Sequence, residues 1–524
     1  MIGQKTILCT AIAALTTLTF AATTAPPPGP TAVAAARFLE QAAFGPTASS
    51  VAEVQALGFS AWIDAQMALP SSQWSVIPDP SVNTAGNTSL RPAQDAFFTN
   101  AVNGKDQLRQ RVAFALAQIW VISGVKLAPE AIVPYLRLLQ KDAFTTYDQL
   151  MYDVTLSPAM GHYLDMVNNN KPTPGHGANE NYAREVLQLF TIGLVELDSS
   201  GRPILKNGVP IPSYTQDNIE GFARTFTGWT YAPKPGANSR FGNPSNWTAP
   251  MVAFQANHDT GAKALLNGYT LPAGQTADTD LKDALHNIFT NSNVGPFICR
   301  ELIQRLVTSN PSPAYVNRIV TVFNNSAQRG DLKNVIKAIL LDTEARKGDD
   351  GSENIATKLR EPVLNIAAML RGLGATVVSP NSMTTYASRL GQTIYYPPTV
   401  FDYFLPGYNI NITSTQTYNA PEFQLLGEAT AMGAADFANT VAYQAPTGVT
   451  VNLTPYINPL GAKPAATDIT KMVESLDVAL MGGRMGTIMR DTIVTAASKQ
   501  TTPKAMVQTA VYLICSSWNY QIER

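Results

Sequence analysis

The sequence predicts an all-α protein: a large multi-helix domain with two long irregular loop regions and little or no β-structure. Apolar residues recur at spacings of three and four through most of the chain, which is the period of amphipathic helices. Strand-like alternation is scarce, and residues 449–453 are its clearest case. Two polar stretches rich in Gly, Pro, Asn, Tyr and Thr, at about 230–278 and 377–466, interrupt the helices.

The first 25 residues resemble a secretory signal peptide. Lys5 precedes an apolar run over 7–20, and small residues over 21–25 lead into three prolines. The apolar run is about 15 residues long, short of the roughly 20 that span a bilayer. We therefore expect the peptide to be removed and the protein to be exported to the periplasm or beyond, without a transmembrane anchor. A Pro-rich linker over 26–36 and a single helical domain over 37–524 would follow.

Helical periodicity is clearest in eight segments. These are 108–122, 182–194, 219–226, 281–289, 297–307, 316–323, 332–341 and 506–514. They extend along nearly the whole mature chain, as expected for one helical domain. No repeat of fixed period links them.

Charge and cysteine content exclude several classes of protein. The chain has 37 basic and 38 acidic residues, a net charge of -1 that would not attract nucleic acid. Cys299 and Cys515 remain after signal removal, and both follow apolar runs typical of buried positions. They could form one disulfide or stay unpaired, and the sequence leaves that open. No metal-ligand spacing and no cofactor motif is present, so we expect neither a metal nor a cofactor.

The segment 179–193 carries two carboxylates and a guanidinium on one predicted helix. Asn179 is suited to capping its start and Gly193 to ending it. Glu180 and Arg184 share one side at a spacing of four, whereas Glu185 points about 100° away. Taken alone, this is an ordinary exposed Glu–Arg pair worth a few tenths of a kcal/mol.

The segment 214–229 has the same character. Thr215 can cap a helix whose polar side carries Asp217 and Arg224, and Trp229 leads into the first long loop. A solvated helix face would show the same pattern.

Inside that loop, His258, Asp259 and Lys263 place a proton acceptor, an anion and a cation within a short length of chain. A histidine in a loop is more often a surface residue that forms hydrogen bonds than a catalytic residue. This segment can therefore also be interpreted as an ordinary surface loop.

Taken together, the three segments resemble the bacterial family catalogued as domain of unknown function 1800. The resemblance covers roughly residues 31–524. Further matching positions are Arg37-Phe38-Leu39, Phe44-Gly45-Pro46, Lys358 to Pro362, Leu390-Gly391-Gln392, Pro397-Pro398 and Tyr512 to Ser517. One departure is Trp518-Asn519-Tyr520, where many relatives read Pro-Glu-Phe. The resemblance implies a large helical exported protein, often encoded beside a partner similar to sulfatases or alkaline phosphatases, and it implies no activity.

If the family pattern holds these residues together, they form a shared polar pocket. We then expect hydrolase-like acid–base chemistry on an anionic or carbohydrate-like substrate. The catalytic candidates are Glu180, Glu185, His258 and Asp259, with Glu185 or His258 as the proton carrier. The substrate-binding candidates are Arg184, Asp217, Arg224, Trp229 and Lys263, with the arginines holding an anionic group and Trp229 stacking on the substrate.

The competing interpretation is a non-catalytic cell-envelope protein. Its polar core would fix the fold, since a buried ion pair is costly to break. Its long loops would bind the sulfatase-like partner or a surface polymer. Whether the protein is an enzyme therefore stays open at the level of sequence.

Overall fold

Helices dominate the structure, as the sequence predicts. It is a computed structural model that describes residues 29–72, 89–351, 357–379, 381–411, 413 and 416–523. The predicted signal peptide lies outside these residues. Within them, no helix is long and apolar enough to cross a membrane.

The helices follow in order. They are α1 (Ala32–Ala42), α2 (Ala48–Leu57), α3 (Phe59–Ala68), α4 (Arg91–Asn103), α5 (Gln107–Ala117), α6 (Pro129–Asp142), α7 (Tyr147–Thr155), α8 (Pro158–Tyr163), α9 (Asn181–Gln188), α10 (Gln216–Thr225), α11 (Ala277–Thr290), α12 (Val294–Leu306), α13 (Pro313–Asn325), α14 (Leu332–Leu341), α15 (Pro362–Gly372), α16 (Asn381–Arg389), α17 (Glu428–Tyr443), α18 (Thr454–Ile457), α19 (Ala466–Met481), α20 (Thr487–Ser498), α21 (Pro503–Cys515) and α22 (Trp518–Gln521). A helix begins or runs within each of the eight segments with helical periodicity, so those predictions are confirmed.

Strands are short and pair two by two in the described part of the chain. They are β1 (Leu205–Lys206), β2 (Val209–Pro210), β3 (Trp229–Thr230), β4 (Val252–Ala253), β5 (Lys263–Ala264), β6 (Thr270–Leu271), β7 (Lys358–Leu359), β8 (Thr376–Val377), β9 (Asn409–Asn411), β10 (Thr417–Asn419), β11 (Val449–Thr450) and β12 (Ile522–Glu523). Each pair is antiparallel, and β11 confirms the one strand suggested by the sequence.

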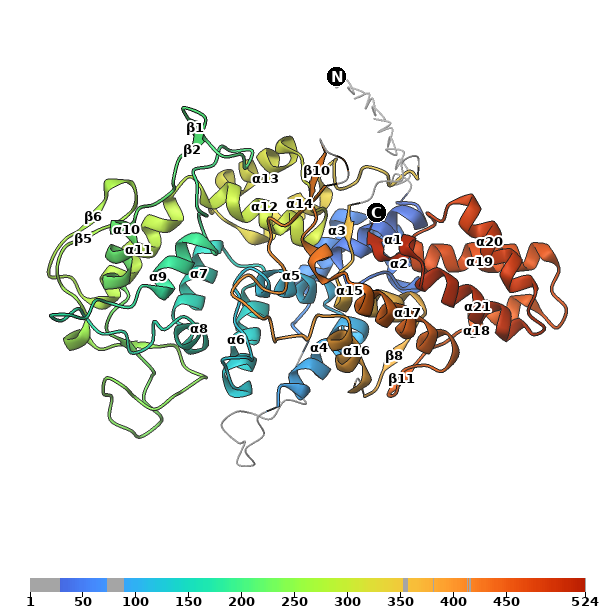
Figure 1. Cartoon of the computed structure of the whole chain (residues 1–524), viewed down its shortest axis with the longest axis horizontal. Coiled ribbons are helices and arrows are strands. Elements are labelled where there is room, and N and C mark those ends of the chain that lie inside the picture. The colour runs from blue at the N-terminus through green and yellow to red at the C-terminus, as the bar shows by residue number, and fades with distance from the viewer. Residues whose placement is uncertain are drawn as a thin grey trace, which may run out of the picture.

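The helices form an elongated molecule (Figure 1). Helices α7 to α11 lie at one end, α18 to α21 lie at the other, and α5 with α12 to α14 lie between them. Buried apolar side chains fall into two clusters. The first is built mainly from residues 35–345 and the second mainly from residues 363–520 with parts of α4 and α5. Cys299 belongs to the first cluster and Cys515 to the second, and both thiols are free.

A buried ionic seam joins the two ends of the chain between these clusters. Arg360 Nη2 lies 3.1 Å from Glu40 Oε1, and Arg360 Nη1 donates to the Tyr520 carbonyl at 3.0 Å. Lys358 Nζ lies 3.3 Å from Glu422 Oε1. The family-like segment Lys358 to Pro362 therefore holds the fold together, because losing one partner of a buried pair strands the other.

Two predicted boundaries are wrong. The linker predicted over 26–36 gives way at Ala32 to α1, which Thr31 caps by accepting a hydrogen bond from the Ala34 N–H. The small alanine side chains of this start are buried against the core, which a linker would not allow. The irregular stretch predicted over 377–466 contains α16 and α17. Helix α17 is rich in Ala, Gly, Thr and Asn and so resembles a loop in composition, yet its buried residues keep helical spacing.

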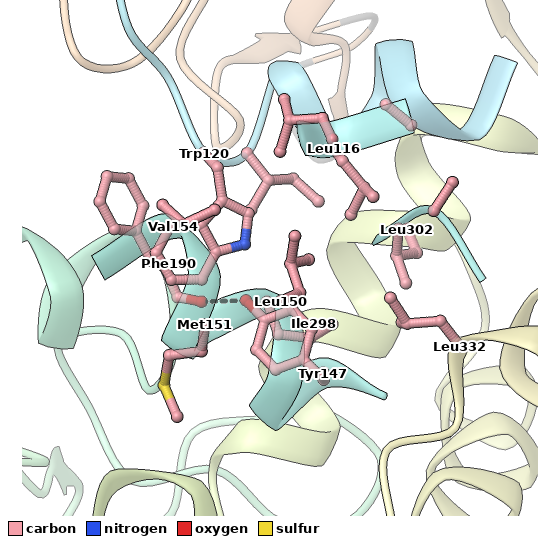
Figure 2. Close-up of a cluster of buried hydrophobic side chains, with 14 of the residues drawn as sticks. Leu116, Trp120, Tyr147, Leu150, Met151, Val154, Phe190, Ile298, Leu302 and Leu332 are labelled. Atoms are coloured by element: carbon pink, nitrogen blue, oxygen red, sulfur yellow. Dashed lines mark hydrogen bonds between the residues drawn. The ribbon is translucent and has the colours of Figure 1, made fainter. Parts of the chain in front are cut away.

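The aromatic cluster in Figure 2 anchors the segment that follows α9. The rings of Trp120 and Phe190 have centroids 4.5 Å apart, and Tyr147 donates its hydroxyl hydrogen to the Phe190 carbonyl. Trp120 lies just beyond α5, Tyr147 begins α7, and Phe190 lies just beyond α9. The C-terminal end of α9 is therefore fixed to the core, which sets the direction of its polar face.

Candidate functional site

Helices α9 and α10 lie side by side and carry most of the predicted site residues. Helix α9 buries one face, and its other faces are polar. The buried residues are Tyr182, Ala183, Val186 and Leu187. The Asn181 N–H donates to Asn179 Oδ1 at 2.9 Å, but Glu180 occupies the N-cap position and makes no side-chain cap hydrogen bond, so the prediction that Asn179 is the N-cap is wrong. On α10, Thr215 and Asn218 form a reciprocal cap. Gln216 at the start of α10 donates to both carboxylate oxygens of Glu180 at 3.1 Å.

The residues between these two helices are open to solvent. Arg184 Nη2 lies 2.7 Å from Glu180 Oε2, and their side chains are 40% and 33% exposed. Asp217 is also exposed. An ion pair of this exposure contributes little stability. Its groups can reach a ligand, so Glu180, Arg184 and Asp217 form a surface patch on α9 and α10.

Arg224 and Asp259 join the far side of α10 to the first long loop. Arg224 Nε and Nη2 donate to the two Asp259 carboxylate oxygens at 2.8 and 2.9 Å, and Nη1 donates to the Ala262 carbonyl at 2.9 Å. Burial tends to raise the pKa of Asp259. The hydrogen bonds from Arg224 and the Gly261 N–H, together with nearby positive charge, outweigh burial and lower it. The guanidinium is thus already occupied by a carboxylate of the same chain.

His258 and Lys263 meet on a residue that the sequence did not single out, Asp280 in the first turn of α11. His258 Nε2 lies 2.9 Å from Asp280 Oδ2, and Lys263 Nζ donates to the same oxygen at 2.6 Å. Lys263 also donates to the carbonyls of Asp259 and Gly261. The side chains of His258, Lys263 and Asp280 are all buried. We call His258, Asp259, Lys263, Arg224 and Asp280 the loop clamp.

The hydrogen bonds of His258 leave its ring no free nitrogen. Nδ1 faces the Thr227 carbonyl at 2.9 Å, and Nε2 faces the Asp280 carboxylate. The Thr227 hydroxyl lies 3.4 Å from the same Nδ1, so both ring nitrogens are engaged by groups of this chain. In this arrangement His258 holds the loop against α10 and α11.

Two glycines let the clamped loop approach α10 closely. A Cβ on Gly221 would lie 1.9 Å from the Ala264 carbonyl oxygen, and a Cβ on Gly228 would lie 2.9 Å from the His258 backbone nitrogen. Gly228 also has φ of +83°, a conformation that favours glycine. Residues 221 and 228 are therefore glycine because the loop backbone passes directly over them.

Trp229 follows Gly228 into β3 and lies in the first apolar cluster. Its side chain is 1% exposed. Its indole Nε1 has no hydrogen-bond partner among the residues that the structure describes. The buried ring offers no face on which a ligand could stack in this conformation.

Glu185 is set apart from the clamp, on the side of α9 that carries Asn181. The two residues are four apart and so neighbour each other on the helix. Asn181 Nδ2 donates to Asp165 Oδ2 at 3.1 Å, and Lys126 Nζ lies 2.7 Å from Asp165 Oδ1. Lys126 also donates to the Tyr163 carbonyl at 2.7 Å. This side of α9 therefore contacts the segment after α8, which in turn contacts the turn before α6.

The Glu185 carboxyl is perturbed in a way that suits proton transfer. The residue is half-buried, and its Oε2 is shielded from solvent without a hydrogen-bond partner among the described residues. Burial raises the pKa of Glu185, and the charge of Arg184 offsets part of that rise. Burial, with the charges of Asp402 and Glu185, raises the pKa of the neighbouring Tyr163 phenol to about 12. We call Glu185, Asn181, Asp165, Lys126 and Tyr163 the α9 face.

The nine predicted residues therefore gather around α10 without converging on one cleft. Arg224, His258, Asp259 and Lys263 meet in the loop clamp, Glu180, Arg184 and Asp217 share the surface patch, Trp229 is in the core, and Glu185 lies on the α9 face. Sequence reasoning missed Asp280, Asp165 and Lys126. Asp280 had a visible signal, since it falls on the apolar stripe of α11 beside Leu281 and Ala284. Over the described ranges, no group of three His, Cys, Asp or Glu residues could hold a metal ion.

The family model described as a protein of unknown function, DUF1800, matches residues 37–522. No curated protein and no solved structure matches the chain.

Proposed function

The chain belongs to the DUF1800 family of proteins of unknown function, and we propose that it carries out acid–base chemistry outside the cytoplasm with Glu185 as the proton carrier. The observation that carries this proposal is the shielded Glu185 Oε2, which has no hydrogen-bond partner in the described part of the chain and belongs to a carboxyl whose pKa burial raises. A carboxyl that stays protonated to a higher pH can donate a proton and take it back. Export follows from the predicted signal peptide.

The groups around Glu185 suit a polar substrate. Arg184 comes one position before Glu185 and is partly exposed, so it can reach an anionic or carbonyl oxygen. Asn181, Asp165 and Lys126 supply donors and acceptors on the same side of α9. Hydrolysis of an ester or glycosidic bond requires this combination of a proton donor and groups that hold the leaving oxygen.

The loop clamp has a supporting role in this proposal. Arg224 and Lys263 are neutralised by Asp259 and Asp280, and His258 has both ring nitrogens engaged. We assign these residues to holding the loop over α10.

The test compares Glu185→Gln with the matched variant Glu180→Gln. Glutamine keeps the size of the side chain and removes the proton, and Glu180 is a solvent-exposed carboxylate on the same helix. Purified proteins are screened against chromogenic carboxyl, phosphate and sulfate esters and glycosides. We expect Glu185→Gln to fold, by circular dichroism, and to lose at least about a hundredfold in rate, the usual effect of removing a general acid. Glu180→Gln should stay within a few-fold of wild type. An unfolded Glu185→Gln protein, or one that keeps its activity, would refute the assignment.

A non-catalytic envelope protein is the second candidate. The burial of Trp229 and the internal pairing of the loop clamp favour it, because they leave Glu180, Arg184 and Asp217 as a surface patch suited to a partner protein. The sulfatase-like protein encoded nearby in related genomes is the partner to test. Co-elution of the two purified proteins that is lost with Arg184→Glu, together with no activity in the screen, would favour this function.

A further inference from the structure

A small cavity lies between α5, α6 and the segment that links α16 to α17. Its volume is about 30 Å³, roughly twice what a water molecule needs. The linking segment is fixed against the residues after α5, because the Gly124 N–H donates to the Tyr395 carbonyl at 2.9 Å and the Ser123 hydroxyl donates to the Pro397 carbonyl at 2.7 Å. The cavity is lined by none of the residues of the loop clamp, the surface patch or the α9 face.

Two buried oxygen atoms of the lining lack a hydrogen-bond donor. Asp402 and Gln118 line the cavity, and each is 4% exposed. Asp402 Oδ2 and Gln118 Oε1 have no hydrogen-bond partner among the described residues. Gln118 Nε2 donates to Glu361 Oε2 at 2.6 Å, which leaves the amide oxygen for the cavity. Because a buried acceptor without a donor is costly, these two atoms favour a ligand that brings donors.

Asp402 also lacks a cationic partner of its own. Within the described part of the chain it forms no ion pair, whereas the nearby Arg305 pairs with Glu301 at 3.6 Å. Burial raises the pKa of Asp402 to about 7, and the opposing charges of Arg305 and Glu361 lower and raise it to a lesser extent. A positive charge inside the cavity would therefore stabilise the ionised carboxylate.

Aromatic rings form much of the remaining wall. Phe114 from α5, Tyr135 from α6, and Tyr395 and Tyr403 from the linking segment line the cavity. Tyr135 and Tyr403 donate their hydroxyl hydrogens to backbone carbonyl oxygens. Aromatic carbon attracts a cation, most strongly over the face of the ring. The wall and the carboxylate therefore favour the same sign of charge.

The backbone of the linking segment is unusual at two of these positions. Tyr395 has φ of +66° and Asp402 has φ of +65°, in the left-handed region that non-glycine residues rarely adopt. Such a conformation costs free energy and persists where the surrounding structure requires it. Here it places both side chains in the lining of the cavity.

We propose that this cavity binds an ammonium ion or the ammonium group of a small primary amine. The ligand would bring a positive charge to Asp402 and donate hydrogen bonds to Asp402 Oδ2 and Gln118 Oε1. Ca²⁺ and Mg²⁺ need about six or more oxygen ligands, and the lining offers two unpartnered ones among the described residues. A water molecule would satisfy both oxygens and leave the carboxylate charge unpaired. The proposal does not depend on the proton-carrier role of Glu185.

Isothermal titration calorimetry with methylammonium chloride tests the proposal, with potassium chloride as the salt control. The purified protein is titrated above pH 7, where much of Asp402 is ionised. We expect methylammonium to bind the wild type and potassium not to bind. Asp402→Asn should weaken the Kd for methylammonium by at least about tenfold, the effect of losing a hydrogen bond to a charged group. Asp436→Asn makes the same change at an exposed residue of α17, outside the cavity, and should bind as wild type does.

Ala117→Leu is a second variant that keeps Asp402. The larger side chain would fill the cavity, so methylammonium binding should be lost. Circular dichroism checks that each variant folds. If methylammonium does not bind the wild type, the cavity holds water only and the proposal is wrong. Binding of potassium with the same affinity, or unchanged affinity for methylammonium in both cavity variants, would also overturn it.

Discussion

The substitution Asp280→Ala tests whether the loop clamp stabilises the fold. The carboxylate receives hydrogen bonds from His258 and Lys263, and removing it leaves two buried donors facing a small cavity. Breaking a buried ion pair from one side costs about 3 to 5 kcal/mol, because the remaining charge stays away from water. Lys263 keeps the carbonyls of Asp259 and Gly261, which limits its share of the loss. We therefore expect the free energy of unfolding to fall by about 3 to 5 kcal/mol.

The matched control is Asp278→Ala, in the same turn of α11. Asp278 is exposed, so its removal subtracts the interaction of a carboxylate with the helix dipole, worth about 0.3 to 1 kcal/mol. Urea unfolding followed by circular dichroism gives both values, and amide hydrogen exchange shows where protection is lost. We expect the loss in Asp280→Ala to spread over residues 258–271. A difference between the two variants below about 1 kcal/mol would refute the idea that the clamp is a buried, paired network.

Three further predictions concern the loop and a buried acid. Gly221→Ala should lower the free energy of unfolding, measured in urea, by about 1 to 3 kcal/mol, because the new Cβ would clash with the Ala264 carbonyl and the backbone would have to shift. An unchanged free energy of unfolding would contradict the close contact between α10 and the loop. Arg224→Lys keeps the positive charge but loses the bidentate contact with Asp259. The free energy of unfolding should therefore fall by about 1 to 2 kcal/mol. An unchanged midpoint in urea unfolding would contradict this prediction. Burial raises the pKa of Asp402 from 3.8 to about 7, so ionising it disfavours the folded state. Stability should then decline as pH rises from about 4 to beyond 7, and Asp402→Asn should gain on wild type across that window; a constant difference between about pH 5 and pH 8 would contradict this.

Local features of the fold could be predicted from sequence because their causes are local. Thr215 caps α10 through residues three positions away, and the periodicity over 332–341 gives the bounds of α14. The predictions were wrong for segments whose amino-acid composition resembles a loop or linker although their side chains pack in a helix. Helix α17 has three alanines among the five residues of its buried side, and α1 begins in an alanine run that resembles a linker in composition.

The candidate site could be predicted only as a set of residues. The family resemblance placed Arg224, His258, Asp259 and Lys263 in one group, and they do contact one another or share Asp280. The resemblance could not show that these side chains bind one another within the protein and not a ligand. The hydrogen-bond partners of a side chain often lie far away in the sequence. The neighbours of Glu185 illustrate this, since Lys126 and Asp165 lie 59 and 20 positions before it.

The most direct test of the proposed chemistry is the titration of Glu185 itself, by carbon-13 NMR of the side-chain carboxyl with Glu185→Gln to assign the signal. The account predicts a midpoint above the value of about 4.3 that an unperturbed glutamate shows, because burial penalises the ionised form. A midpoint at or below that value would mean that Glu185 is an ordinary ionised carboxylate and cannot serve as the proton carrier.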